Sequence, residues 1–72
     1  MTQEQKIALL EETLEVDEGT LTPETVLDDV EEYDSMSKLA LIVMFEDECG
    51  KRISGEEIRA FKTVNDILIA MG

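Results

Sequence analysis

Apolar residues recur at helical spacing in several segments of the chain, and polar or flexible residues separate these segments. The first segment, about residues 3–16, has apolar residues one or two turns apart, a spacing that places them on one face of a helix. Thr2 lies three residues before Gln5, which is the arrangement of a capping box at a helix start. We expect this helix to end near Gly19, since glycine tolerates the positive φ found at many helix ends. The residues expected on its inner face are Ile7, Leu10 and Leu14.

The second segment, about residues 35–49, is the most apolar and holds no Gly or Pro. It begins beside the polar pair Asp34-Ser35 and ends at Gly50, which together are typical of a helix with an N-cap and a glycine C-cap. We expect a core face made of Leu39, Ile42, Phe45 and Cys49, widened by Leu41 and Val43. Three carboxylates lie at the C-terminal end, where the helix dipole disfavours negative charge, and this favours a binding role for Glu46, Asp47 and Glu48.

Two shorter helices are expected in the last third of the chain. Ser54 begins a capping box that opens a short helix, and this helix runs through Ile58 to Phe61. Thr63 caps the last helix. The inner face of the last helix is Val64, Ile67, Leu68 and Met71.

Residues 17–33 show no long periodic pattern, but they contain the small helix-start signal Thr22-Pro23. We expect an ordered loop with one turn there, anchored by Leu21, Val26, Leu27 and Val30. The pattern therefore predicts an all-α fold, a four-helix bundle with three main helices, a short third helix and a long loop between helices 1 and 2. All of it lies in a single domain over residues 1–72.

Composition narrows the possible functions. The chain has 18 acidic and 6 basic residues and a formal net charge of −12, which disfavours binding to nucleic acids and to anionic membranes. The same charge favours protein partners with basic patches. One cysteine and no histidine exclude an intramolecular disulfide, a structural zinc site and the histidine-dependent catalytic triads.

The longest apolar run, Leu39 to Phe45, has seven residues, whereas roughly 20 are needed to span a bilayer. The start of the chain lacks the basic and apolar regions of a secretory signal. Together with the free Cys49, these features lead us to expect a cytoplasmic location.

Ser35 is the candidate for chemistry, because a serine at a helix start lies beside unpaired N–H groups that favour a phosphate. The simplest interpretation is that Asp34 or Ser35 only caps the helix. Ser35 to Lys38 also fits the S-x-x-K motif of penicillin-recognising enzymes, but the further motifs of those enzymes are missing. An EF-hand centred on Gly50 fails too, because Phe45 and Cys49 would occupy ligand positions. We therefore expect no catalytic residue and no specific metal site.

The whole chain resembles the acyl carrier proteins. The resemblance lies in Asp34-Ser35-Met36, which matches the Asp-Ser-Leu/Met motif of that family, followed by the apolar and acidic parts of the second helix. It continues through Ile53, Glu56-Glu57 and Thr63-Val64, and covers essentially the full length.

This resemblance implies that Ser35 is the attachment site of 4′-phosphopantetheine, which a phosphopantetheinyl transferase moves from coenzyme A. The thiol of the group then carries acyl cargo as a thioester, and the carrier, which is not an enzyme, presents it to others in fatty acid and lipid metabolism. Asp34 would help to position the serine, and Met36 would contact partners. Glu46, Asp47 and Glu48 would dock onto basic patches of transferring or loading enzymes, with the carrier acting as a monomer.

Some positions differ from the fatty-acid carriers of that family: Glu32-Tyr33 precedes the motif, Lys38 and Ala40 lie on the second helix, and Cys49 replaces a common aromatic. An aminoacyl carrier, for example a D-alanyl or peptidyl carrier, therefore stays open. An unmodified acidic helical module that binds a basic protein is the alternative outside the carrier class.

Overall fold

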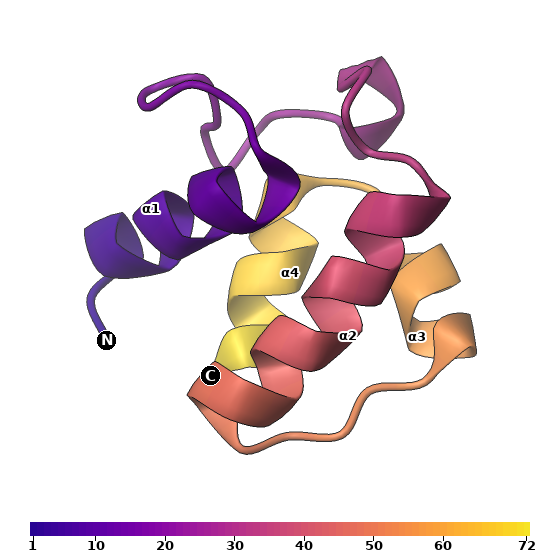
Figure 1. The fold of residues 1–72 in the computed structure, drawn as a ribbon. Coiled ribbons are helices and arrows are strands. Elements are labelled where there is room, and N and C mark those ends of the chain that lie inside the picture. Colours follow the sequence, from indigo (N-terminus) through magenta and orange to yellow (C-terminus); the bar gives the residue numbers. More distant parts are fainter.

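Four α-helices and one 3-10 turn form the structure, a computed structural model that describes residues 1–72 (Figure 1). The predicted all-α four-helix bundle, with a short third helix and a long first loop, is confirmed. None of the helices is long and apolar enough to cross a bilayer. The elements in chain order are α1 (Gln3–Leu14), the 3-10 turn η1 (Leu27–Asp29), α2 (Ser35–Cys49), α3 (Gly55–Ala60) and α4 (Val64–Met71).

The predicted capping box at the start of α1 is present, with reciprocal hydrogen bonds between Thr2 and Gln5 of 2.8 and 3.2 Å. The helix ends earlier than expected, at Leu14, and its C-cap Glu15 adopts the left-handed conformation with φ of 58°. Its N–H donates to the carbonyls of Glu11 and Glu12, so the last turn closes without a glycine. Gly19, with φ of 85°, lies in the turn that follows rather than at the helix end.

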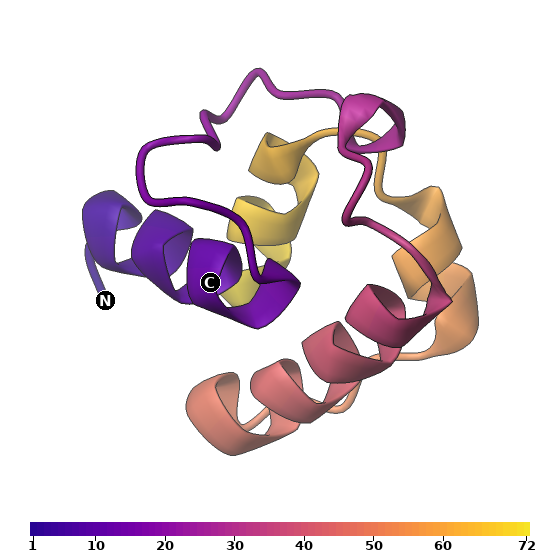
Figure 2. The same ribbon diagram turned by 45° about the horizontal axis from the view of Figure 1, so that its top comes forward.

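The long loop crosses the top of the bundle from the end of α1 to the start of α2 (Figure 2). Leu21 and Leu27 are buried and anchor it, and the predicted anchor Val30 packs, partly buried, against the core. Val26, predicted to anchor it too, is 43% exposed. The helix-start signal at Thr22-Pro23 produces only a hydrogen-bonded turn, and the short helix η1 forms a few residues later. This loop is therefore ordered by apolar contacts with the core at three of the four predicted positions.

Glu11 is the charged residue that ties the loop to α1. Its side chain is only 5% exposed, and Oε2 accepts hydrogen bonds from the backbone N–H groups of Gly19, at 2.8 Å, and Leu21, at 3.1 Å. Glu11 lies one turn after Ile7 and one turn before Leu14, beside the apolar face of α1, but its charge led sequence reasoning to group it with the exposed acids. A buried carboxylate with two amide donors satisfies loop backbone groups that would otherwise be unpaired.

We expect Glu11→Ala to lower the free energy of unfolding by about 1–3 kcal/mol, because it leaves two loop amides without their charged acceptor. Glu12→Ala is the matched control, since Glu12 is the next residue on the same helix and is exposed. It should change stability by about 0.5 kcal/mol or less. Urea denaturation followed by circular dichroism measures both, and equal effects of the two variants would contradict the anchoring role.

The core lies between α2, α4 and the inner side of α1, and α2 presents only part of the face that the pattern predicted: Phe45 and Leu41 are buried, and Ile42 and Cys49 pack against the core. Its buried residues are Leu41, Met44 and Phe45, while Leu39 and Val43 are 62% and 56% exposed. The expected assignment of Leu39 and Val43 to the core is therefore wrong. Apolar residues occur nearly all around this helix, so the pattern alone cannot choose the side that packs.

The last two helices mostly follow the prediction. Ser54 accepts a hydrogen bond from the Glu57 N–H at 3.2 Å, but the reciprocal bond of a capping box is not formed. α3 ends at Ala60, one residue before Phe61, whose ring stacks on Phe45 with centroids 6.3 Å apart. The capping box of Thr63 with Asp66 is confirmed, and the inner face of α4 is buried as expected: Val64, Ile67, Leu68 and Met71.

Candidate functional site

Ser35 is the first residue of α2 and is exposed to solvent. Asp34 is the N-cap of the helix, and its Oδ1 accepts a hydrogen bond from the Ser37 N–H at 2.9 Å. The other two serines use their side chains inside the protein: the Ser37 hydroxyl donates to the carbonyl of Glu32, and that of Ser54 accepts from an amide. Ser35 is thus the serine whose hydroxyl is left without a hydrogen bond to the protein.

The carboxylate of Asp34 stays at the helix start in its ionised form. The hydrogen bond from the Ser37 backbone amide is the main reason why the pKa of this carboxyl lies below its ordinary value. Desolvation is the next largest influence and raises the pKa, and the backbone amides of Met36 and Asp34 lower it further. Asp34 therefore orders the first turn of α2 and holds Ser35 at its tip.

We expect Asp34 to titrate below about 3.9, the ordinary value for Asp. Since the folded pKa is the lower one, ionised Asp34 stabilises the fold above the unfolded pKa, and this contribution disappears as the pH falls through the folded pKa. An NMR titration that follows the carboxyl carbon measures the folded pKa. Asp34→Asn, which keeps an N-cap that does not titrate, should remove this part of the pH dependence of stability. A folded pKa at or above the ordinary value would contradict the cap.

A pocket of about 410 Å³ lies between α2 and α3, and Ser35 is part of its wall. We call it the α2–α3 pocket. It has an apolar surface from both helices and two cationic side chains, Lys38 and Arg59. Sequence reasoning missed it, because α2 and α3 come together only in the folded chain. The residues that line it are Ser35, Lys38, Leu39, Ile42, Gly55, Ile58 and Arg59.

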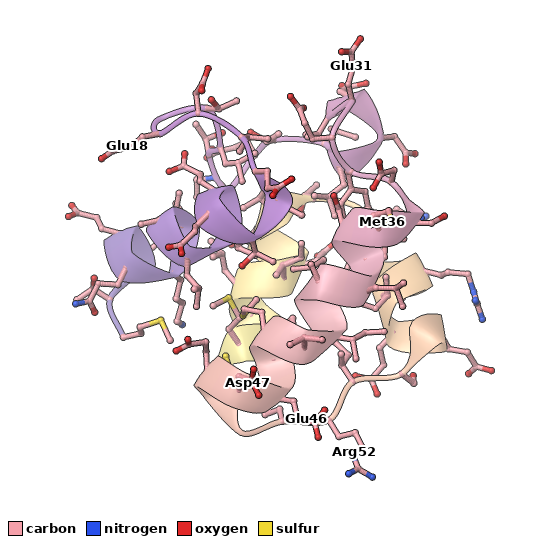
Figure 3. The ribbon with its side chains drawn as sticks, viewed as in Figure 1. Glu18, Glu31, Met36, Glu46, Asp47 and Arg52 are labelled. Carbon is pink, nitrogen blue, oxygen red and sulfur yellow. The ribbon has the colours of Figure 1, made fainter.

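The candidate partner-binding residues lie along α2. Met36 is 76% exposed near the start of the helix, and Glu46 and Asp47 lie near its end (Figure 3). Glu46 follows Met36 by ten positions along the helix, a rise of about 15 Å. An exposed apolar stripe bridges this distance, and it consists of Met36, Leu39 and Val43.

The acidic end of α2 comprises Glu46, Asp47 and Glu48, all exposed. Glu46 is partly engaged with Arg52, with 3.8 Å between Nη2 and Oε1, and both side chains are largely open to solvent. The structure thus keeps the predicted acidic residues together but places them at the opposite end of the helix from Ser35. No group of three or more Cys, Asp or Glu side chains is arranged to hold a metal ion.

Comparison with known families decides the class of the chain. The profile of the family described as "Phosphopantetheine attachment site" matches residues 7–70. The chain belongs to this family of acyl carrier proteins. The family carries 4′-phosphopantetheine as a covalently attached prosthetic group, and its members are in general not catalysts. They interact with the enzymes that modify them and with those that handle their acyl groups.

The chain has curated relatives in mycobacteria. The chain is 32% identical, over 72 residues, to the meromycolate extension acyl carrier proteins of Mycobacterium leprae (strain TN) and Mycobacterium tuberculosis (strain ATCC 25618 / H37Rv). The alignment covers 94% of this chain and 63% of each relative, so the chain spans less than two thirds of their length. No solved structure matches it.

The residues at the start of α2 fit the prosthetic group of the carrier family. An attachment serine needs a hydroxyl that a transferase can reach and that no internal hydrogen bond occupies, and Ser35 meets both conditions. The N-terminal end of a helix also favours the negative charge of a phosphodiester. The α2–α3 pocket, which begins at Ser35, falls within the size range of about 300–1,000 Å³ that small-molecule sites have.

Proposed function

We propose that the chain, as one carrier domain over residues 1–72, carries acyl groups on 4′-phosphopantetheine attached to the Ser35 hydroxyl. The observation that carries this proposal is the position of Ser35, exposed at the first residue of α2 with no hydrogen bond from its side chain. When bound, the group supplies a terminal thiol that holds the cargo as a thioester. Ser35 provides the tether, and Asp34 fixes the helix start that presents it.

In the loading reaction, the Ser35 oxygen forms a bond to the phosphorus that carries the pantetheine in coenzyme A. The bond between that phosphorus and the bridging oxygen of the pyrophosphate breaks, and adenosine 3′,5′-bisphosphate leaves. The serine proton passes to the transferase or to solvent. The side chain acts only as the acceptor, and its activation is left to the transferase.

Two features support a docking role for the exposed side of α2. The apolar stripe offers contact area, and the acidic end of the helix offers charge to a basic patch. Charged residues at the rim of such an interface mainly steer association and select the partner. The partners are then a phosphopantetheinyl transferase and the acyl-transferring or acyl-loading enzymes. The carrier binds them as a monomer. The free Cys49 supports a reducing, cytoplasmic compartment.

The cargo that we propose is an acyl chain of fatty acid or lipid metabolism. The relatives support this choice, because they are named as acyl carriers of meromycolate extension. An aminoacyl carrier is not favoured by these relatives.

Intact-mass measurement tests the proposal directly. After incubation with coenzyme A, Mg²⁺ and a broad-specificity phosphopantetheinyl transferase, the chain should gain the mass of one phosphopantetheine. An unmodified interaction module would keep its mass, and that result would overturn the carrier function. Trapping and weighing the thioester from native cells then identifies the cargo, and an amino acid there would replace the acyl assignment.

A further inference from the structure

The negative charge of the chain is concentrated in its first half. Residues 1–34 contain 12 acidic residues and one basic residue, whereas residues 35–72 contain 6 and 5. The two halves therefore carry formal charges of −11 and −1, which together give the −12 of the whole chain. Within the long loop, residues 17–32 hold seven acidic side chains, all exposed, and no basic one. The loop is thus the most strongly negative surface of the protein.

The acidic end of α2 is partly neutralised by comparison. The three acids at positions 46–48 are followed within four residues by two bases. One of these bases, Arg52, forms the single ion pair within 4.0 Å in the protein, with Glu46. Figure 3 shows the two acidic groups at opposite ends of the molecule, with Glu18 and Glu31 at the end where α2 begins. A basic partner is therefore attracted more strongly to the loop end than to the C-terminal end of α2.

A second pocket, of about 320 Å³, lies at this loop end, between the end of α1 and the start of α2. We call it the α1–α2 pocket, and it shares no residue with the α2–α3 pocket. Its wall holds three carboxylates, from Glu15, Glu32 and Asp34, and no basic side chain. The buried Leu14 and the exposed Met36 add apolar surface. A side chain with an aliphatic stem and a cationic head, such as arginine, suits this wall.

The position of the α1–α2 pocket indicates which partner can use it. Asp34 and Met36, two residues of its wall, are the neighbours of Ser35 in sequence. Met36 also begins the exposed apolar stripe of α2, so the pocket and the stripe form one continuous surface. A transferase must bring its active site to the Ser35 oxygen itself, whereas enzymes that act on the cargo reach it through the arm. The transferase is therefore the partner that has to contact this surface.

We propose that the phosphopantetheinyl transferase docks on the loop end of the carrier and inserts an arginine into the α1–α2 pocket. The proposal rests on the attachment to Ser35 proposed above. The exposed acids of the loop speed the encounter with a basic surface, and the pocket carboxylates hold the arginine once it is desolvated. The apolar stripe adds contact area next to it. The acidic end of α2 has a smaller part in this complex and is left for the enzymes that act on the cargo.

Two double variants that remove the same charge test the docking site. Glu15→Gln combined with Glu32→Gln should lower the kcat/KM of phosphopantetheine loading about tenfold or more, mainly through KM, because an arginine anchor loses its charged partners. Glu46→Gln combined with Asp47→Asn is the matched control and should lower it by about twofold or less, as rim charges do. Circular dichroism verifies that both variants are folded. Equal losses in the two variants, or a larger loss in the control, would overturn the docking site.

A binding map gives a readout that does not depend on loading. Isotope-labelled Ser35→Ala carrier cannot accept the group but keeps the whole docking surface, so it is titrated with an unlabelled broad-specificity phosphopantetheinyl transferase. The backbone amides of residues 14–36 should shift or broaden most, and those of residues 46–52 should change little. A map centred on residues 46–52 would show that the transferase docks at the acidic end of α2 instead, and the proposal would be wrong.

A salt series tests the role of the loop acids. Raising the ionic strength from about 0.01 M to about 1 M shortens the Debye length from about 30 Å to about 3 Å. Loading of the wild-type chain should slow over this range, and Glu18→Gln combined with Glu31→Gln should load several-fold more slowly than wild type at low salt only. A salt-independent kcat/KM would overturn the attraction by the loop.

Intact mass separates this proposal from the attachment itself. If the wild-type chain gains no mass, the attachment to Ser35 fails. If it gains one phosphopantetheine while the two double variants of the docking test load equally fast, only the docking site is overturned.

Discussion

Replacing Ser35 with alanine is expected to abolish phosphopantetheine addition completely, because the transferred group needs an oxygen at this position to form its phosphodiester. Neither of the other two serines takes its place in the structure. Ser37 is half-buried and donates to the Glu32 carbonyl, and Ser54 lies at the start of α3 and caps it. The loss should therefore be complete rather than partial. Intact mass after incubation with transferase and coenzyme A measures it.

Ser37→Ala is the matched control, two residues along the same helix. It removes a hydroxyl from the same turn but leaves Ser35 in place, so loading should reach the wild-type extent. Circular dichroism of both variants verifies that α2 remains folded. A mass gain in Ser35→Ala, or its loss in Ser37→Ala, would contradict the assignment of the tether.

The candidate site was only partly predictable from the sequence, and the reason is the range of the interactions. Asp34 and Ser35 are neighbours at a helix start, so a local pattern of cap and apolar segment identifies them. Arg59 lies on another helix, and no pattern in the sequence relates it to Ser35. The α2–α3 pocket and its two cations became visible only when α3 was placed against α2.

The same distinction holds for the fold. The capping boxes at Thr2 and Thr63 depend on residues three positions apart, and both formed as predicted. The buried carboxylate of Glu11 bonds to amides eight and ten residues away, across a turn whose shape the sequence does not specify. Its charge indicates an exposed acid, whereas the tertiary structure buries it beside the apolar face of α1.

The orientation of α2 shows most clearly that tertiary packing decides which face of a helix is buried. Four consecutive turns of this helix carry apolar residues on more than one side, so several faces are compatible with a core. Packing of α2 in the core, where it contacts α1, buries Leu41, Met44 and Phe45. The apolar stripe stays outside, and in a carrier this leaves contact area for partners on the helix that begins with Ser35.

A comparison of Phe45→Ala with Leu39→Ala tests this orientation of α2. The loss of stability in Phe45→Ala is the second large effect that we expect. Phe45 is 1% exposed and stacks on Phe61, so its truncation should lower the free energy of unfolding by about 3–5 kcal/mol. That equals the whole net stability expected for a chain of this size, about 3–5 kcal/mol, so the variant should be largely unfolded at 25 °C. Leu39→Ala, on the same helix but mostly exposed, should change it by about 0.5 kcal/mol or less.

Urea denaturation followed by far-ultraviolet circular dichroism measures both variants, with the loss of helical signal in Phe45→Ala visible before any denaturant is added. If Leu39→Ala were as damaging as Phe45→Ala, the side of α2 chosen from the sequence pattern would be the buried one. The apolar stripe would then belong to the core. The docking role proposed for it would fail, while the attachment of the prosthetic group to Ser35 would be unaffected, because that residue lies at the tip of the helix in either orientation.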